Sequence, residues 1–308
     1  MPTVALIGVG IMGSRLGERL MKAGFTVRGF DVDPERMAEF AAAGGVATGS
    51  PAEAVEGCEL VVLSLLTSDI SRQVCLGPDG IVASSTRPLL VLDATTGRPD
   101  DAVAIAGDLA SAGVDYADMT VSGNAAVASR GELVVMLGGS AEAYAKAGPI
   151  MQAIGRSSHH VGSVGAGARM KLIVNHVLAV NRAALAEGLV AAELAGLDLA
   201  KTLEVLADGV AYSRAMDLWG RRMVEGDHEQ PNARLRQSHK DSKLIVEHAH
   251  QVGAPAAFIE QVESHLGEGV SGGLADKDNS SVVEVIRRRA GVGRIPRADG
   301  ETEGDGNG

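Results

Sequence analysis

The chain has 308 residues, of which 45% are hydrophobic, 3% aromatic and 22% charged, and its formal net charge is −11. Since a domain has about 100–200 residues, this length predicts two domains or one large one. The acidic balance excludes proteins that coat the phosphate backbone of nucleic acids, which need a basic surface. The shortage of aromatic side chains argues against stacking platforms for single-stranded nucleic acid.

Two cysteines, Cys58 and Cys75, are too few for a disulfide framework, and their spacing matches no zinc site. We expect both to be reduced and partly buried, as in a cytoplasmic protein. The first three residues carry no basic side chain, and the apolar residues 4–7 lead into glycines rather than a cleavage site, so no secretory signal peptide is predicted. Charged residues interrupt the apolar stretch at 166–196, and no apolar run reaches the roughly 20 residues of a membrane span. The sequence therefore predicts a soluble, cytoplasmic protein.

The first half of the chain alternates short β-branched runs with helical patterns. Strands are predicted at 4–7, 26–30, 60–66, 89–93, 114–117 and 133–137. Stretches of about 10–15 residues with helical periodicity lie between most of them, which is typical of βαβ units. We therefore expect an α/β domain with a mainly parallel sheet over residues 1–164.

The pattern changes near residue 165. One long helix is predicted over about 167–196, and because it is apolar nearly all round, we expect it to be buried between other elements. Further helices are predicted at 199–207, 213–224, 235–252, 256–266 and 281–290, with no strand among them. Residues 165–296 are thus expected to form an all-α domain joined through the long helix. Residues 297–308, with four acidic residues and four glycines, are expected to be a disordered tail.

Residues 8–13 have the sequence Gly-Val-Gly-Ile-Met-Gly, which matches G-x-G-x-x-G. The pattern alone is weak, but here it follows a predicted strand and opens a helix, as in the dinucleotide-binding turn of a Rossmann domain. Gly8 allows the tight turn, Gly10 lets the backbone approach a pyrophosphate, and Gly13 permits close packing of helix on strand. The pyrophosphate is expected at the positive end of the helix dipole. The alternative is that these are ordinary turn glycines.

Asp31 closes the second predicted strand. A carboxylate there accepts hydrogen bonds from the adenosine ribose hydroxyls and repels a 2′-phosphate, so NAD is favoured over NADP as the cofactor. Arg28 and Arg36 are the counter-argument, because an arginine in this region can also bind that phosphate; we expect both to lie on solvated faces instead. Asp33 and Pro34 predict the N-cap and first turn of the next helix.

The start of the long helix carries a second set of polar residues. Lys171 and Asn175 are four positions apart and so share one helix face. Their neighbours are Met, Leu, Ile, Val and Ala, which would partly desolvate the lysine, lower its pKa and suit it to proton exchange near neutral pH. The alternative is a lysine whose stem lies along an exposed stripe with its ammonium in water.

Several motifs occur in order over roughly residues 3–290. They are the loop at 8–13 with Met12, Asp-Ala-Thr-Thr at 93–96, Asp-Met-Thr-Val-Ser-Gly-Asn at 118–124, Gly-Ala-Gly-Ala-Arg-Met-Lys-Leu-Ile-Val-Asn at 165–175, and His-Lys-Asp-Ser-Lys-Leu at 239–244. In these motifs the sequence resembles the β-hydroxyacid dehydrogenase family. The corresponding family segments are G-x-G-x-M-G, D-x-S-T, D-x-P-V-S-G-G, G-x-G-x-x-x-K-x-x-x-N and K-D-x-x-L.

The resemblance implies roles in catalysis and substrate binding. Lys171 would be the general acid/base, which takes the hydroxyl proton while hydride leaves the same carbon for the nicotinamide C4. Asn175 would hold Lys171 and a substrate oxygen in place. Ser122 and the backbone N–H of Gly123 would bind the substrate carboxylate.

The resemblance also implies the residues that contact the cofactor. Lys240 would contact it or help to close the cleft, and Asp241 would orient that lysine; the alternative for Asp241 is an ordinary helix charge. Thr96 would hydrogen-bond near the nicotinamide, and Leu65 and Leu66 would flank the adenosine side. The full expected cofactor-binding set is Gly8, Gly10, Ile11, Met12, Gly13, Asp31, Leu65, Leu66, Thr96 and Lys240.

Some positions depart from the family pattern. Thr120 stands where the family often has Pro, and Asn124 replaces the second Gly of S-G-G. Asn124 joins the expected substrate-binding residues, because it adds a donor and an acceptor for a substrate with an extra polar group. His176 is either a second proton carrier or a packed helical side chain, and Arg234 and Arg236 either meet a second carboxylate or face solvent. The histidines lack metal-ligand spacing, so no metal is expected.

We therefore expect an NAD-dependent oxidoreductase that interconverts a small β-hydroxy acid and its semialdehyde or keto acid. The alternatives are an NADPH-preferring semialdehyde or imine reductase of the same fold, or a non-catalytic dinucleotide-binding sensor. The lysine at 171 argues against the imine reductases, which generally lack it, and against a sensor. The apolar helical second half predicts a homodimer or homotetramer, and the expected partner is a small hydroxy acid rather than nucleic acid or membrane.

Overall fold

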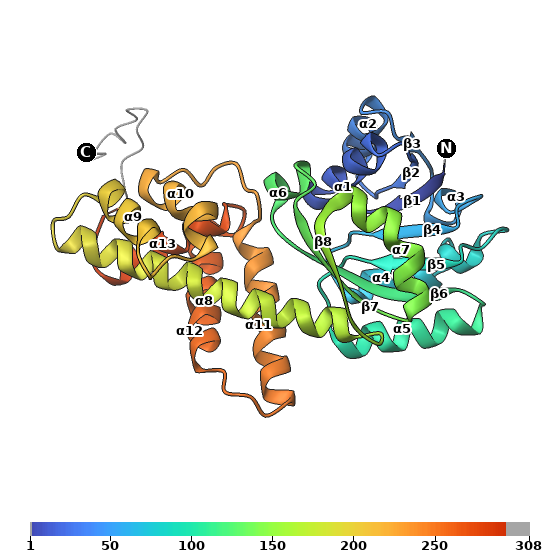
Figure 1. Cartoon of the computed structure of the whole chain (residues 1–308). Coiled ribbons are helices and arrows are strands. Elements are labelled where there is room, and N and C mark those ends of the chain that lie inside the picture. The colour runs from blue at the N-terminus through green and yellow to red at the C-terminus, as the bar shows by residue number, and fades with distance from the viewer. Residues whose placement is uncertain (1, 294–308) are drawn as a thin grey trace, which may run out of the picture. The chain divides into compact units, whose positions relative to one another are not determined.

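The computed structural model describes residues 2–293 (Figure 1). The chain separates into two compact units, the first ending at Ile173 and the second beginning at Val174. The long helix α8 (Ala166–Leu194) contributes residues to both. The boundary expected at 164/165 stays a prediction, and the tail expected at 297–308 lies outside the described residues.

The first unit is built on a sheet of eight strands in the order β3-β2-β1-β4-β5-β6-β7-β8. Their bounds are Thr3–Ile7, Thr26–Phe30, Val46–Ala47, Leu60–Leu63, Leu90–Asp93, Asp115–Ser122, Leu133–Gly138 and Gly155–Gly162 for β1 to β8. All neighbouring pairs are parallel except β6 and β7, which are antiparallel. The first six strands have the doubly wound Rossmann order, so the predicted mainly parallel α/β fold is confirmed.

Helices cover both faces of this sheet (Figure 1). They are α1 (Ile11–Lys22), α2 (Pro34–Ala42), α3 (Pro51–Ala54), α4 (Ser68–Leu76), α5 (Pro99–Ser111), α6 (Ala125–Ser129) and α7 (Ala141–Ile154), with a short 3₁₀ turn η1 (Ile81–Ala83). Local sequence starts several of them. Asp33 caps α2 by accepting the N–H of Glu35 at 3.0 Å, with Pro34 in the first turn, as predicted.

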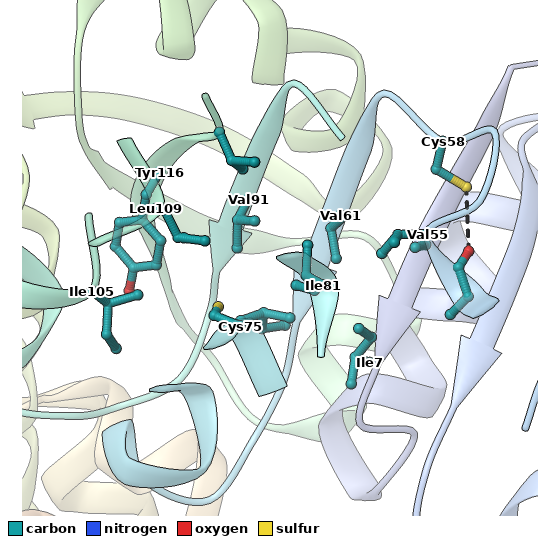
Figure 2. Packing of buried hydrophobic residues seen from close by; sticks show 14 of the residues in the cluster. Ile7, Val55, Cys58, Val61, Cys75, Ile81, Val91, Ile105, Leu109 and Tyr116 are labelled. Atoms are coloured by element: carbon teal, nitrogen blue, oxygen red, sulfur yellow. Dashed lines mark hydrogen bonds between the residues drawn. The ribbon is translucent and has the colours of Figure 1, made fainter. Parts of the chain in front are cut away.

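Alternating side chains of the central strands supply two cores. Ile7, Val61 and Val91 point from three neighbouring strands toward Cys75 of α4 and Ile81 of η1 (Figure 2). On each of these strands an adjacent residue, which points to the opposite face of the sheet, is also buried. Burial on both faces is typical of parallel strands that are covered by helices on both sides. Each large aliphatic side chain buried in this way contributes about 1.5–3 kcal/mol.

Both cysteines belong to the core of the first unit. Cys58 and Cys75 are free and buried, somewhat more deeply than the partial burial expected. The Cys58 thiol lies 3.5 Å from the carbonyl oxygen of Ala54, to which it donates (Figure 2). Burial is the main cause that raises the pKa of both thiols.

Helices make up the second unit. After α8 come α9 (Leu199–Asp208), the π-helical turn η2 (Met216–Gly220), α10 (Arg221–Glu225), α11 (Leu235–Gln251), α12 (Ala257–Gly269), a second π-helical turn η3 (Val270–Leu274), the 3₁₀ turn η4 (Asn279–Ser281) and α13 (Val282–Arg289). As far as residue 293, the only β-type pairing in this unit is an isolated bridge between Arg234 and Asp278. The predicted all-helical second part is therefore confirmed.

Some expectations about individual elements are wrong. The strands β3 and β8 were not predicted, because β3 has two residues and β8 is a polar edge strand that pairs only with β7. The helix α8 is not buried all round: Ile173, Val177 and Leu194 are each more than half exposed. Between residues 2 and 293, no helix combines the length and the hydropathy that crossing a bilayer requires.

Candidate functional site

The loop between β1 and α1 contains glycines of two kinds. At Gly8, where φ is +90°, an added Cβ would lie 2.3 Å from the carbonyl oxygen of Ser64, and at Gly13 it would lie 1.9 Å from that of Gly8. The fold itself therefore requires these two glycines. At Gly10, where φ is −66°, the nearest atom to an added Cβ is the flexible end of Arg36, at 3.4 Å. Packing does not require a glycine at position 10, so its bare backbone fits the close approach of a ligand.

The N-terminus of α1 provides an electrostatic site beside that bare backbone. Gly10 is the N-cap, no side chain caps the helix, and its first turn contains no acidic residue. The first N–H groups of such a helix are directed outward with the positive end of the helix dipole, which suits a pyrophosphate. The residues of the loop thus fit the cofactor that its sequence predicts.

Asp31 holds the end of β2 to this loop. One carboxylate oxygen accepts the N–H of Val9 at 2.8 Å, and the other accepts the N–H of Asp33 at 3.0 Å. Its side chain is only 8% exposed. Asp31 therefore has a structural task besides any contact with a ribose.

The two arginines near Asp31 are engaged by the protein. The guanidinium of Arg28 donates to the backbone oxygens of Ala54, at 3.1 Å, and Glu53, at 2.7 Å. Arg28 thus lies on a partly exposed face, as expected, with its guanidinium bound to backbone oxygens. Arg36 is half exposed and forms ion pairs with Asp33 at 3.2 Å and more loosely with Asp31 at 3.8 Å. Neither arginine is free of a carboxylate or carbonyl partner, which weakens the case for a 2′-phosphate site.

A buried carboxylate organises the ends of β4 and β5. Asp93 accepts the N–H of Thr95 at 2.9 Å and the hydroxyl of Tyr116 at 3.0 Å. The Thr95 hydroxyl in turn accepts the N–H of Leu65 at 3.1 Å. Burial raises the pKa of Asp93, and the hydrogen bonds that it accepts oppose that effect. The turn that carries Thr96 is thereby tied to the loop that carries Leu65, both expected near the cofactor.

The first turn of α8 is anchored on β6. One oxygen of Asp118 accepts the N–H of Gly165 at 2.8 Å, and the other accepts the N–H of Ala168 at 2.6 Å. The Thr120 hydroxyl donates to the carbonyl oxygen of Gly167 at 2.9 Å. An added Cβ on Gly167 would lie 2.2 Å from the backbone oxygen of Asp118, so this glycine permits the close approach. Burial raises the pKa of Asp118 to about 6.

Lys171 lies against the segment predicted to bind substrate. Its ammonium donates to the carbonyl oxygen of Val121 at 2.7 Å, one residue before Ser122. Gly123 follows with φ of +140°, where a side chain would be strained. The carbonyl oxygen of the Asn124 side chain accepts the N–H of Val127 at 3.1 Å and caps α6. The structure therefore places the Lys171 ammonium at the residue that precedes the 122–124 segment, within the first unit.

Asn175 belongs to a cluster within the second unit. Its amide donates to a carboxylate oxygen of Asp241 at 3.3 Å. The other oxygen of Asp241 lies 3.0 Å from the ammonium of Lys240. The expected pairing of Asp241 with Lys240 is present in the structure, and Asp241 also contacts Asn175.

The structure shows the surroundings of three residues whose roles the sequence leaves open, Arg234, Arg236 and His176. Arg236 forms an ion pair with Asp276 at 2.8 Å, and Arg234 lies 3.7 Å from the same carboxylate. Asp276 therefore pairs closely with Arg236, whereas the Nε of Arg234 makes no hydrogen bond among the described residues, and the roles of both arginines stay open. His176 is half-buried on α8.

Sequence reasoning missed two kinds of buried residue. Asp93, Asp118 and Thr120 appeared only as members of motifs, and their buried hydrogen bonds follow from the tertiary structure. Arg182 is 4% exposed on α8, with its guanidinium 5.0 Å from the ring of Trp219. Burial lowers the pKa of Arg182 to about 10, and Asp278 and Asp241 oppose that effect. The sequence feature that could have indicated this buried arginine is its position within an apolar stretch of the long helix.

Among residues 2–293, no group of three or more His, Cys, Asp or Glu side chains is arranged to hold a metal ion.

Comparison with known proteins identifies the family. The profile of the NAD binding domain of 6-phosphogluconate dehydrogenase matches residues 3–162, and that of the NAD-binding domain of NADP-dependent 3-hydroxyisobutyrate dehydrogenase matches residues 165–286. The chain is 28% identical to 2-(hydroxymethyl)glutarate dehydrogenase of Eubacterium barkeri over 94% of this chain and 96% of that one. It is 32% identical to 3-hydroxyisobutyrate dehydrogenase of Pseudomonas aeruginosa over 71% and 74% of the two chains.

A solved structure agrees with these matches. The crystal structure of 3-hydroxyisobutyrate dehydrogenase from Salmonella typhimurium superposes with a TM-score of 0.85 at 25% identity, over 92% of this chain and all of that one. The matching profiles together span both units, and the resemblance predicted from the motifs is confirmed. The chain belongs to the β-hydroxyacid dehydrogenase family of NAD(P)-dependent oxidoreductases.

Proposed function

We propose that this protein interconverts a small β-hydroxy acid and the corresponding semialdehyde or keto acid, with NAD as the cofactor and Lys171 as the general acid/base. The observation that carries the proposal is the bond of 2.7 Å from the Lys171 ammonium to the carbonyl oxygen of Val121. This bond holds a proton-carrying group beside Ser122 and Gly123, on a helix whose next turn carries Asn175.

Each residue would have one task in the oxidative direction. Bound NAD supplies the hydride acceptor. Lys171, as the neutral amine, takes the proton from the substrate hydroxyl, and in the reverse direction the ammonium returns it. The hydroxyl of Ser122 and the N–H of Gly123 bind the carboxylate, and Asn175, held by Asp241, orients the reacting oxygen.

Asn124 favours a substrate with an additional hydrogen-bond acceptor. Its side-chain oxygen is already used in capping α6, so its amide NH₂ group is what remains to offer donors. A second carboxylate or a sulfonate matches that chemistry better than an ammonium does. The relative named for 2-(hydroxymethyl)glutarate takes, by that name, a dicarboxylate.

The test of catalysis uses purified protein, NAD and a panel of hydroxy acids, with NADH followed by its absorbance. The panel contains 3-hydroxyisobutyrate, serine, glycerate, threonate, 2-(hydroxymethyl)glutarate and 2,3-dihydroxypropanesulfonate. The Lys171→Ala variant is expected to lose at least about 100-fold in turnover and still to bind NAD. Lys146→Ala, which removes an exposed lysine of α7 in the same unit, is the matched control.

Each outcome decides between the alternatives. Near-full turnover by Lys171→Ala would refute the assigned acid/base. Turnover with NADPH and a cyclic imine, but with no hydroxy acid or semialdehyde, would favour an imine reductase. Tight binding of NADH without turnover of any compound would favour a sensor.

The preference for NAD rests on Asp31. Asp31→Ala is expected to raise the KM for NAD by about 10- to 100-fold, the value of one or two charge-assisted hydrogen bonds, and to affect NADP much less. Because Asp31 also holds the N–H of Val9, equal losses with the two cofactors would show that its role is only structural and would refute the ribose contact.

We also propose that the protein forms a homodimer or homotetramer through the second unit. None of the residues of α9 is buried. The exposed large apolar residues in α9 and on either side of it are Leu194, Leu197, Val205, Val210 and Tyr212. Patches of this kind mark interaction surfaces. Val205→Lys combined with Val210→Glu is expected to convert the oligomer to monomer in sedimentation velocity, and a wild-type monomer at micromolar concentration would refute the proposal. The cytoplasmic location stays a prediction.

A further inference from the structure

Four hydrogen bonds, made by three side chains, join β6 to the start of α8. Asp118 accepts the N–H groups of Gly165 and Ala168, at 2.8 and 2.6 Å. Two residues further along the strand, the Thr120 hydroxyl donates to the carbonyl oxygen of Gly167 at 2.9 Å. These contacts use buried side chains, since Asp118 is 2% exposed and Thr120 is fully buried. The fourth bond comes from a side chain of the helix, as Lys171 donates to the carbonyl oxygen of Val121.

Glycine allows the strand and the helix to come this close. An added Cβ on Gly167 would lie 2.2 Å from the backbone oxygen of Asp118. On the neighbouring strand, an added Cβ on Gly138 would lie 2.6 Å from the backbone nitrogen of Gly167 and 2.7 Å from the Asp118 carboxylate. Backbone therefore packs on backbone, and the helix start has little freedom to slide along the strand.

The contacts also fix how the helix is rotated. Successive residues of a helix turn by about 100°, with a rise of about 1.5 Å. Contacts at residues 165, 167 and 168 therefore hold the helix start on more than one side of its axis. Such a set of contacts determines the position of Lys171, one turn later.

We propose that Asp118 and Thr120 are positioning residues that set the register of α8 on β6, and thereby place Lys171 beside Ser122 and Gly123. The inference rests on the proposed function, in which Lys171 exchanges the proton. A misplacement of about 1 Å in a reacting group is enough to cost on the order of 100-fold in rate. Of these contacts, the hydrogen bond from the Thr120 hydroxyl is the one that a single substitution can remove with the smallest change in side-chain shape.

Thr120→Val is the test variant, because it keeps the branched shape and removes only the hydroxyl. The Gly167 carbonyl also lies within the helix ladder, where it accepts the N–H of residue 171. The hydroxyl also lies 3.3 Å from the carbonyl oxygen of Met136 in β7, a longer contact than the one to Gly167. Since the carbonyl oxygen of Gly167 keeps its partner in the helix, we expect the variant to fold. The expected result is a loss of at least about 10-fold in kcat with the KM for NAD unchanged, and Thr120→Ser restores the rate.

Thr48→Val is the matched control. Thr48 donates to the carbonyl oxygen of Gly29 at 2.9 Å, and it follows β3, which lies five strands from β6 in the sheet. The control is expected to keep its kcat. The isotope effect with deuterated substrate is expected to rise in Thr120→Val, because a misplaced lysine slows the chemical step, and to stay unchanged in Thr48→Val.

The results separate this inference from the proposed function. If Lys171→Ala is inactive while folded Thr120→Val keeps kcat within about twofold of wild type, the positioning role is overturned and the acid/base role stands. If Thr120→Val and Thr48→Val lose kcat equally, or Thr120→Ser restores nothing, the positioning role is also overturned. If Lys171→Ala is fully active, the acid/base role in the proposed function is refuted, and the positioning role that rests on it is refuted as well.

Discussion

Asp118 is expected to make the protein less stable as the pH rises through about 6. Burial raises its pKa from 3.8 to about 6, although the N–H groups of Ala168 and Gly165 act in the opposite direction and the charge of Asp93 adds to the rise. In the unfolded chain the same carboxyl titrates near its ordinary value. Between the two values the folded state binds more protons than the unfolded state, so the free energy of unfolding falls as the pH increases.

The size of the effect follows from the gap between the two pKa values. Each pKa unit is worth about 1.4 kcal/mol, so the gap between 3.8 and about 6 corresponds to about 3 kcal/mol. This contribution is fully present below 3.8 and is lost above about 6. It is opposite in sign to that of a surface carboxylate in an ion pair, which stabilises the folded state at neutral pH.

The assay compares wild type with Asp118→Asn, which cannot titrate at this position. Urea unfolding followed by circular dichroism gives both free energies of unfolding from about pH 4 to about pH 7, and their difference is expected to change by about 2 kcal/mol in favour of the variant, since part of the effect lies below this range. Asp115→Asn removes an exposed carboxylate from the same strand and serves as the control. A difference that is constant with pH, or that favours the wild type at higher pH, would refute the reasoning.

Three further predictions concern packing and burial. Gly167→Ala places a Cβ 2.2 Å from a backbone oxygen of β6 and is expected to lower the free energy of unfolding, measured by thermal unfolding, by about 1–3 kcal/mol. Gly188→Ala in the same helix, where a Cβ meets nothing within 4 Å, is the control and is expected to be neutral or stabilising. Equal effects of the two substitutions would contradict the close-approach argument. Cys58 and Cys75 are expected to react with a thiol reagent only after the protein unfolds, because both are buried, and fast labelling of the native protein would contradict this. Arg182→Met removes a buried cation near two carboxylates and is expected to lower the free energy of unfolding by about 1–3 kcal/mol. Denaturant unfolding followed by the fluorescence of the single tryptophan measures this change. An unchanged unfolding midpoint would show that the cation contributes little to stability.

Local sequence was enough to predict the elements whose signal is local. Thr26–Phe30 is predicted with the bounds that the structure has, and Asp33 with Pro34 starts a helix as expected, because the strand pattern and the cap depend on neighbouring residues. The role of Gly13 is also local, since an added Cβ there would meet the backbone of Gly8, whereas the Ser64 oxygen that an added Cβ on Gly8 would meet belongs to another strand end. Motif order led to the family for the same reason, because each motif is a short run of adjacent residues.

The sequence by itself thus determined the fold class, the order of most elements and the chemical types at the candidate site. Only the tertiary structure decided what contacts what over long separations. The contact of Asp118 with Gly165 and Ala168 joins residues about 50 positions apart, and nothing in either segment specifies its partner. The edge strand β8 and the exposed side of α8 escaped prediction for a related reason: burial depends on which neighbours pack against an element, and that is a property of the whole fold.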